Sequence, residues 1–527
     1  MAAREACVLV LGGPGTGKTT AALWAARDLL DEAGRLPYQR VLFLTFSRSA
    51  VAQIARRAPD IFTADRSRIE ITTFHGLAWR LISAFGRYAG HGRQLPPLQS
   101  EARGKLLGND PDTLTYDSLI PNALETLKSQ RVRRLLARRW PLIICDEFQD
   151  TNDQQWTLLV ELSRSGRLLL LADPNQMIYT FLKNQGVGAS RLEEGRRRSQ
   201  RVIELGSASH RDPSGAIPAM ADAIRRRAFE DPAIDHAAKT HRLRVVGNVA
   251  DDALTAVITE QVARLRNSGA KTVGIFGHSN QGVAMLGDSL ARSGLDHVLV
   301  GIPAAQAEAF SALAHLCGFG IGLVKSQEAR LGLATFLTSC TRGKSPPSLA
   351  VSLARGLPLP DQIAERLDAL EQALRTAADG TVGELGQAAM EAWKAIRITR
   401  GNRPWRRACQ DFANAVRPLA SLRASDEAIR RLMVAAERRR PSALAELEAS
   451  RSSPVQLMNF YQTKGREADA VLLVYRSDDY IADSRDTEPY EEPSRVLFVS
   501  LTRGRREVVV VLPRDPHPLV APFLRWA

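Results

Sequence analysis

A glycine-rich stretch near the start of the chain constrains the fold more than any other feature. Residues 8–20 read VLVLGGPGTGKTT: an apolar run, then the pattern G-x-x-x-x-G-K-[ST], followed by a helix-compatible run. Glycines let backbone N–H groups approach an anion closely, and a helix N-terminus favours negative charge. The pattern predicts a buried strand, a phosphate-binding loop and a helix, the start of a nucleotide-hydrolysing domain. The candidate nucleotide-binding residues of this loop are Gly12, Gly13, Pro14, Gly15, Thr16, Gly17, Lys18, Thr19 and Thr20.

A second apolar run, PLIIC at 141–145, ends in the paired acids Asp146 and Glu147. Acids that follow a buried strand, in a chain that has a phosphate loop, indicate a site for Mg²⁺ and for the attacking water. We expect Asp146 and the Thr19 hydroxyl to hold Mg²⁺, Lys18 to bind the β- and γ-phosphates, and Glu147 to orient the water. An exposed acidic turn is the alternative interpretation.

Other apolar runs carry polar and aromatic residues at their carboxyl ends, where ligands bind in open α/β sheets. The run VLFL at 41–44 is one, a strand starting near Ile69 is the next, and LLLL at 168–171 is followed by ADPNQMIYTF. Gln176 lies where an amide could sense the γ-phosphate. Tyr179 and Phe181 are two residues apart, so both would lie on one face of an extended segment. Such aromatic residues could stack on bases, and core packing is the competing interpretation. The candidate nucleic-acid contacts are Thr45, Phe46, Ser47, Thr73, His75, Tyr179 and Phe181.

The formal net charge of +14 and the pI of about 9.9 suit a polyanionic partner, and a genome bias toward arginine and alanine is the alternative explanation. The basic run KSQRVRRLLARR at 128–139 is either one solvated helix face or a DNA-facing patch. Five scattered cysteines contain no C-x-x-C pair, so neither a disulfide framework nor a zinc site is indicated. No apolar run is long enough for a membrane span, and the first strand leaves no room for a signal peptide. We therefore expect a cytoplasmic protein with no membrane partner.

Seven motifs, read in order, resemble those of superfamily 1 helicases of the UvrD/Rep branch. Four of them belong to the first part of the chain: TFS (45–47), TFHGLAWRLI (73–82), DEFQDTN (146–152) and DPNQMIYTF (173–181). Three follow later: SHRDPSGAIPAMADAI (209–224), VQLMNFYQTKGREADAVLLV (455–474) and RVLFVSLTRGRREVVVVLP (495–513). With the phosphate loop, they extend the resemblance from residue 8 to residue 513.

The resemblance implies an α/β fold with two RecA-like P-loop NTPase cores, each having a parallel sheet and a mainly helical insertion. We expect the first core at 1–82 and 139–205, with a short helical insertion at 83–138. The second core is expected at 206–302 and 453–527, with a helical insertion at 303–452. ATP and Mg²⁺ would bind in the cleft between the two cores.

The resemblance also assigns roles to residues outside the phosphate loop. Arg211 and Arg503 match arginines that reach the γ-phosphate from the second core and neutralise charge during phosphoryl transfer. Glu467 matches an acid near the ribose, in the same loop as Lys464 and Gly465, and His210 replaces a tyrosine that stacks near the adenine. No glutamine precedes the first strand, so base selectivity is expected to be loose. The expected catalytic residues are Lys18, Asp146, Glu147, Gln176, Arg211 and Arg503.

The resemblance implies an ATP-dependent translocase or helicase on single-stranded or tailed duplex DNA, moving 3′ to 5′. Both expected insertions are short. The resemblance therefore supports translocation along DNA more directly than processive unwinding of a duplex. The alternative is a DNA-gated ATPase that regulates a partner, such as a nuclease or another protein of a repair or defence complex. RNA also stays open as a substrate, because a groove that tracks the backbone need not read the sugar.

Overall fold

The computed structural model describes two compact units. The described residues are 6–31, 36–62, 66–90, 98–107, 114–164, 166–206, 208–300, 304–341, 345–439, 454–479, 481–482 and 487–527. Unit 1 comprises Met1–Arg93, Ile120–Val300 and Ala449–Ala527, and unit 2 comprises Gln94–Leu119 and Gly301–Glu448. The division of the chain into four parts at the expected boundaries stays a prediction.

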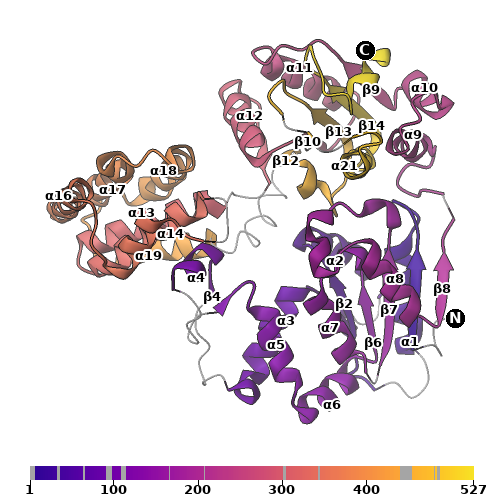
Figure 1. Cartoon of the computed structure of the whole chain (residues 1–527), viewed down its shortest axis with the longest axis horizontal. Coiled ribbons are helices and arrows are strands. Elements are labelled where there is room, and N and C mark those ends of the chain that lie inside the picture. The colour runs from indigo at the N-terminus through magenta and orange to yellow at the C-terminus, as the bar shows by residue number, and fades with distance from the viewer. Residues whose placement is uncertain are drawn as a thin grey trace. The chain divides into compact units, whose positions relative to one another are not determined.

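Unit 1 contains a first sheet of six parallel strands in the order β3-β2-β6-β7-β1-β8 (Figure 1). Its strands are β1 (Cys7–Leu11), β2 (Val41–Thr45), β3 (Ile69–Thr73), β6 (Leu142–Cys145), β7 (Arg167–Ala172) and β8 (Arg201–Glu204). The associated helices are α1 (Lys18–Asp31), α2 (Arg48–Ile61), α3 (Phe74–Phe85), α5 (Leu119–Leu127), α6 (Gln130–Arg139), α7 (Asp153–Leu162) and α8 (Ala189–Arg198). The central strands are apolar throughout because helices cover both faces of such a sheet. Alternate strand residues, such as Phe43 and Ile144, pack against Leu23 on α1 and Ile54 on α2.

A second sheet of six parallel strands, also in unit 1, has the order β11-β12-β10-β13-β14-β9. Its strands are β9 (Leu243–Val246), β10 (Val273–Gly277), β11 (Val298–Leu299), β12 (Val455–Asn459), β13 (Ala468–Val474) and β14 (Gly504–Val511). The helices around it are α9 (Ala216–Arg225), α10 (Pro232–Lys239), α11 (Leu254–Asn267), α12 (Asn280–Arg292) and α21 (Glu491–Leu501). Ile275 and Leu472 pack with α11 on one face, while Leu473 packs with α9 and α21 on the other. The two parallel sheets confirm the expected α/β fold class.

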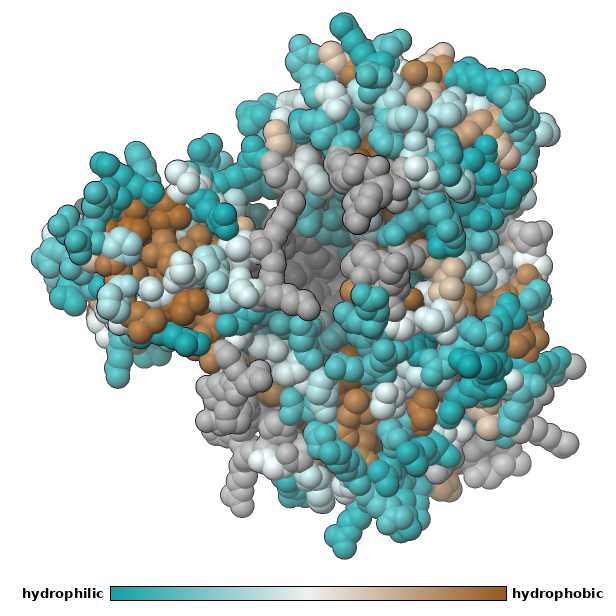
Figure 2. All heavy atoms as spheres, viewed as in Figure 1, coloured by the Kyte–Doolittle hydropathy of each residue, from teal (hydrophilic) through white to brown (hydrophobic). Residues whose placement is uncertain are grey.

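Unit 2 is a helical bundle with its own hydrophobic core (Figure 1). Its elements are β4 (Leu98–Gln99), α4 (Glu101–Leu107), β5 (Leu114–Thr115), α13 (Ala304–Gly320), α14 (Ser326–Ser339), α15 (Ser348–Arg355), α16 (Asp361–Ala378), α17 (Val382–Ile396), α18 (Asn402–Val416) and α19 (Asp426–Arg439). The rings of Trp393 and Trp405 stack at 5.2 Å, and Leu106 of α4 belongs to the same core. Figure 2 shows hydrophobic residues in patches among hydrophilic ones on the visible face of this bundle. None of the described helices in either unit is long and apolar enough to cross a bilayer.

Short 3₁₀ helices connect many of these elements and carry several of the motif residues. They are η1 (Arg66–Arg68), η2 (Gly86–Ala89), η3 (Phe148–Asp150), η4 (Pro174–Gln176), η5 (Thr180–Gln185), η6 (Arg417–Leu419), η7 (Phe460–Thr463) and η8 (Ala521–Trp526). Three of them matter for the site in unit 1. η3 follows β6 and η4 follows β7 in the first sheet, and η7 follows β12 in the second.

Candidate nucleotide and nucleic-acid site

The glycine-rich loop connects the end of β1 to the start of α1, as its sequence predicts. Gly15 and Gly17 have φ angles of +78° and +87°, which residues with a Cβ rarely adopt. A Cβ on Gly15 would also collide with the Ser209 hydroxyl, and the Gly15 carbonyl accepts a hydrogen bond from the His210 backbone at 2.8 Å. The segment that follows β8 therefore packs directly on the loop.

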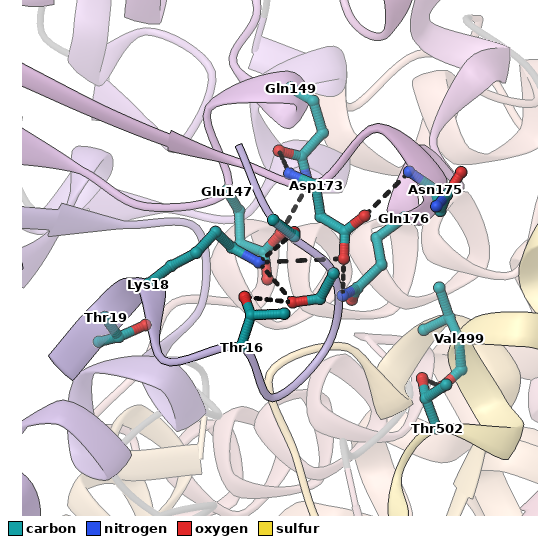
Figure 3. Close-up of polar contacts among 12 residues, drawn as sticks. Thr16, Lys18, Thr19, Glu147, Gln149, Asp173, Asn175, Gln176, Val499 and Thr502 are labelled. Carbon is teal, nitrogen blue, oxygen red and sulfur yellow. Dashed lines mark hydrogen bonds and ion pairs between the residues drawn. The ribbon is translucent and has the colours of Figure 1, made fainter. Parts of the chain in front are cut away.

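Lys18 folds back onto its own loop. Its Nζ donates to the carbonyls of Gly12 at 2.5 Å and Gly13 at 2.9 Å, and it lies 3.9 Å from Asp173 Oδ2 (Figure 3). Lysine is a compact cation on a flexible stem, so rotation of this stem can bring the ammonium to a bound phosphate. The loop thus provides an anion site with a movable cation.

Asp146 and Glu147 follow β6 directly and lie beside this cation. The Thr19 hydroxyl is 3.4 Å from Asp146 Oδ2, which joins the two expected Mg²⁺ ligands. Burial and the neighbouring Glu147 raise the pKa of Asp146 to about 7. Burial also acts to raise the pKa of Glu147, but Lys464 and Lys18 hold this pKa below its ordinary value. Glu147 has a φ angle of +53°, a strained conformation of the kind that clusters at functional sites.

A chain of hydrogen-bonded side chains links Glu147 to the second sheet. Gln149 donates to Glu147 Oε2 at 2.6 Å and accepts a hydrogen bond from the Asp173 backbone at 3.1 Å. Gln176 donates to Asp173 Oδ2 at 2.6 Å and accepts a hydrogen bond from Arg503 at 2.9 Å. Figure 3 shows Gln149, Asp173 and Gln176 converging beside Lys18. These hydrogen bonds therefore run without interruption from Glu147, after β6, to Arg503, before β14.

Two cations from the second sheet meet this network. Arg503, between α21 and β14, is 2% exposed, and burial lowers its pKa to about 10. Lys464, after η7, donates to the Gln176 carbonyl at 2.6 Å, and its Nζ lies 2.5 Å from Asp150 Oδ2 and 3.7 Å from Glu147 Oε2. Both residues thus lie against the polar edge of the first sheet.

Arg211 and Glu467 are paired with each other in this conformation. Arg211 donates to Glu467 Oε1 at 2.5 Å and to the Thr502 carbonyl at 2.8 Å, and Arg505 donates to Glu467 Oε2 at 2.6 Å. Burial would raise the pKa of Glu467, but these arginines lower it to about 2. The contact of Glu467 with a ribose and that of Arg211 with a γ-phosphate stay predictions.

A cavity of about 780 Å³ joins the predicted nucleotide residues. Among those predicted residues, only Gly12 does not line it, and its carbonyl instead binds Lys18. The lining also includes Trp24 and Arg57, which lie outside the quoted motifs, and Arg505, which lies inside the motif at 495–513 but was not predicted as a site residue. The predicted residues that line it are Gly13, Pro14, Gly15, Thr16, Gly17, Lys18, Thr19, Thr20, Asp146, Glu147, Gln176, His210, Arg211, Gly465, Glu467 and Arg503.

In the described part of the chain, the predicted nucleic-acid contacts, unlike most of the predicted nucleotide residues, do not line the cavity of about 780 Å³. The rings of Phe46 and Tyr179 stack at 5.2 Å, which brings together two residues that follow different strands. Ser47 and Thr73 cap α2 and α3 by accepting hydrogen bonds from the Ala50 and Gly76 backbones. These two contacts support the helix N-termini and leave a role in DNA binding as a prediction.

The remaining three predicted contacts have different surroundings. Thr45 is buried, and its hydroxyl has no hydrogen-bond partner among the described residues. His75 lies in the first turn of α3. The side chain of Phe181 lies outside the described residues, and Thr180–Gln185 form η5 rather than an extended segment. The spacing of Tyr179 and Phe181 therefore does not place them on one face of a strand.

Three residues that sequence analysis did not place in the site take central positions. Gln149 and Asp173 connect the acid pair to Gln176 through hydrogen bonds, and Asp150 forms an ion pair with Lys464. Gln149 and Asp150 lie inside DEFQDTN and Asp173 begins DPNQMIYTF, so the motifs did contain them. A motif gives neighbours along the chain, whereas these roles depend on side chains brought together by folding.

Comparison with known proteins agrees with this arrangement. The family model described as "AAA domain" matches residues 1–182. DNA helicase II of Salmonella typhimurium is 22% identical over 289 residues, which are 41% of this chain and 40% of the relative. ATP-dependent DNA helicase PcrA of Leuconostoc citreum is 26% identical over 236 residues, 33% of this chain and 31% of the relative. RecBCD enzyme subunit RecB of Mycolicibacterium smegmatis is 42% identical over 74 residues, 13% of this chain and 7% of the relative.

Each of these matches spans less than half of the named relative, and the RecB match spans a small part of it. They nevertheless agree with the two parallel sheets and with the glycine-rich loop, acid pair and arginines that line one cavity. Over the matched stretches, the chain is therefore similar to UvrD/Rep-like DNA helicases of superfamily 1.

Proposed function

We propose that the chain is an ATP-dependent translocase or helicase on single-stranded DNA, with 3′ to 5′ movement. The observation that carries this proposal is the hydrogen bond from Arg503 to Gln176 at 2.9 Å. Gln176 also binds Asp173, which lies 3.9 Å from Lys18 of the phosphate loop, so one amide links an arginine beside the second sheet to an acid beside this loop. Such a link is what a motor requires in order to convert nucleotide turnover into relative movement of two cores.

The residues present fit ATP with Mg²⁺. The Thr19 hydroxyl and the Asp146 carboxylate are hard oxygen ligands 3.4 Å apart, and burial of Asp146 favours a compensating cation. Bound Mg²⁺ would neutralise charge on the phosphate oxygens. Lys18 would leave the Gly12 and Gly13 carbonyls for the phosphates, and the loop N–H groups would surround them.

Glu147 is the residue best placed to orient the attacking water. Lys464 and Lys18 keep it in the carboxylate form, which accepts a hydrogen bond from water, and Gln149 fixes one of its oxygens. Arg503 and Arg211 would stabilise the charge of the transferred phosphoryl group from the second core. Arg211 is paired with Glu467 in this structure, and a rearrangement of this ion pair on nucleotide binding is part of the proposal.

The stacked rings of Phe46 and Tyr179 form the proposed DNA contact, since aromatic faces bind bases without sequence preference. Tailed duplex DNA would be the substrate for unwinding. The named relatives favour a motor over a purely regulatory ATPase. Similarity to RecB supports a role in a repair complex with a partner protein. A cytoplasmic location stays a prediction.

The deciding experiment measures ATP hydrolysis with and without single-stranded DNA, and strand displacement from a 3′-tailed duplex. DNA should strongly stimulate ATP hydrolysis by the wild-type protein. The Lys18→Ala variant should not hydrolyse ATP, because the phosphates lose their main cation. Arg27→Ala changes an exposed cation on the same helix and serves as the matched control. Stimulation without strand displacement would indicate translocation or the regulatory role. A rate of ATP hydrolysis that does not change when DNA is added would contradict the proposal.

A further inference from the structure

A second cavity, of about 600 Å³, lies in unit 1 at the opposite edge of the first sheet from the nucleotide site. It is bordered by α3, by α6 and by residues that precede or begin β2, β3 and β6. The phosphate loop and the acid pair, in contrast, follow the ends of β1 and β6. We name this cavity the α3/α6 groove. Its occupant would not compete with nucleotide for space.

The interior of the α3/α6 groove is apolar. Leu81, Leu136 and Trp140 are buried at 2%, 4% and 5% exposure and form its base. Leu135 and Tyr38, which also line it, are 53% and 52% exposed. Large apolar side chains that are about half exposed and lie beside an apolar hollow are typical of a protein-binding surface. The groove thus offers room for apolar side chains of another molecule.

The rim of the groove is basic. Arg80, Arg138 and Arg139 line it, and among the described lining residues Glu70 is the one acid. Glu70 is already engaged, because it accepts a hydrogen bond from Arg139 Nε at 2.8 Å and lies 3.7 Å from Arg80. The whole of α6, QRVRRLLARR, contains five arginines and no acid. The uncompensated charge around the hollow is therefore positive.

We propose that the α3/α6 groove docks an acidic amphipathic segment of a partner protein. Apolar side chains of the segment enter the hollow beside Leu135, and its carboxylates pair with Arg138 and Arg80. A nucleic-acid backbone would satisfy the arginines but would leave the apolar interior empty, whereas an amphipathic segment satisfies both. This inference goes beyond the proposed motor function and does not depend on it, because binding at this edge requires no nucleotide.

The test is fluorescence anisotropy with the full chain and three labelled synthetic peptides. One peptide is an amphipathic helix of Leu, Ala and Glu, the second has Lys in place of Glu, and the third is a shuffled form of the first. Leu135→Asp and Arg138→Glu alter the groove. Leu422→Asp changes another exposed leucine, in unit 2, and Arg131→Glu changes an exposed arginine of α6 that does not line the groove. Thermal unfolding of each variant checks that it folds.

We expect the acidic peptide to bind and the lysine and shuffled peptides to bind at least about tenfold more weakly. Leu135→Asp and Arg138→Glu should each weaken binding about tenfold, while Leu422→Asp and Arg131→Glu should change it little. Hydrogen exchange with the acidic peptide should show protection at 77–85 and 131–140. Equal binding of all peptides, or loss in the control variants as well, would overturn the proposal. Loss of single-stranded DNA affinity in both groove variants, with no peptide binding, would instead assign the surface to nucleic acid.

Discussion

Lys464 and Asp150 form a buried ion pair that joins the two sheets of unit 1. Lys464 Nζ lies 2.5 Å from Asp150 Oδ2, and the side chains are 5% and 0% exposed. Among the described residues, no hydrogen-bond donor other than the Lys464 ammonium meets the oxygens of Asp150, so this ammonium supplies the principal compensation of its charge. Lys464 also lies 5.4 Å from the Tyr179 ring, which stacks on Phe46. The same cation thus contacts the acid cluster and the proposed DNA-binding aromatics.

Removing one member of this pair should cost more than removing both. Above pH 7, where Asp150 of the wild type is ionised, Lys464→Met removes the cation of a buried carboxylate, and breaking such a pair costs up to about 3–5 kcal/mol. The double variant Asp150→Asn/Lys464→Met removes both charges and should recover most of that loss. Thermal or urea unfolding of the wild type and the variants measures the difference. A single variant as stable as wild type, or a double variant no better than the single, would contradict this prediction.

The stability of the protein should respond to pH through Asp150. Burial raises the pKa of Asp150 to about 7, with Lys464 opposing part of the effect. The unfolded chain has an ordinary aspartate pKa of about 4, so the folded state binds more protons between these values. The free energy of unfolding should therefore fall as pH rises from about 4 to 7. Asp150→Asn should reduce this slope, measured as the thermal midpoint across that range, and Asp379→Asn at an exposed position should not.

Arg503 should be needed for turnover and dispensable for nucleotide docking. Its guanidinium reaches the network from the second sheet, whereas Lys18, Asp146 and Glu147 belong to the first. An arginine finger contributes about 10³–10⁵ in rate in related reactions, so Arg503→Ala should lower DNA-stimulated hydrolysis by orders of magnitude. Arg503→Lys should rescue little, because an ammonium lacks the planar fork. Steady-state hydrolysis and ADP titration test both variants, and near-normal turnover in Arg503→Ala would refute the assignment.

Tyr179→Ala and Phe46→Ala should each weaken binding of single-stranded DNA by about 1–3 kcal/mol, the contribution of one base stack. ADP affinity should change little, because neither ring lines the nucleotide cavity. Tyr88→Ala, which removes an exposed aromatic ring, is the matched control. The measurement is anisotropy with a labelled oligonucleotide. Unchanged DNA affinity together with a lower unfolding midpoint would show that these rings serve packing alone.

The sequence was sufficient to predict the phosphate loop and five of the six strands of the first sheet, all but β8. Buried parallel strands appear as uninterrupted apolar runs, as at VLFL and LLLL, and the glycines of the loop mark a conformation that other residues avoid. Gln176 and Arg503 were found because each lies inside a recognisable motif. Local pattern and motif order therefore sufficed wherever a residue's role is set by its own neighbours along the chain.

Other features could not be predicted, because they depend on contacts between distant segments. The ion pair of Arg211 and Glu467 joins residues 256 positions apart, and neither local sequence contains its partner. The α3/α6 groove combines Tyr38, Leu81 and Leu135 from three separate segments. The spacing of Tyr179 and Phe181 suggested an extended face, but η5 begins at Thr180. Local spacing is informative only when the local conformation is known.

The composition of unit 2 has a consequence for synthesis on the ribosome. Leu106 of α4 is 1% exposed within a core otherwise built from α13 to α19, and Arg103 pairs with Glu328 at 2.5 Å. At about 5–20 residues per second, translation delivers α13 and α14 roughly 10–40 s after α4. During that interval the apolar face of α4 lacks the helices that bury it in the folded chain. A nascent chain that pauses between these segments should therefore engage chaperones, and silent codon changes there should alter the yield of folded protein.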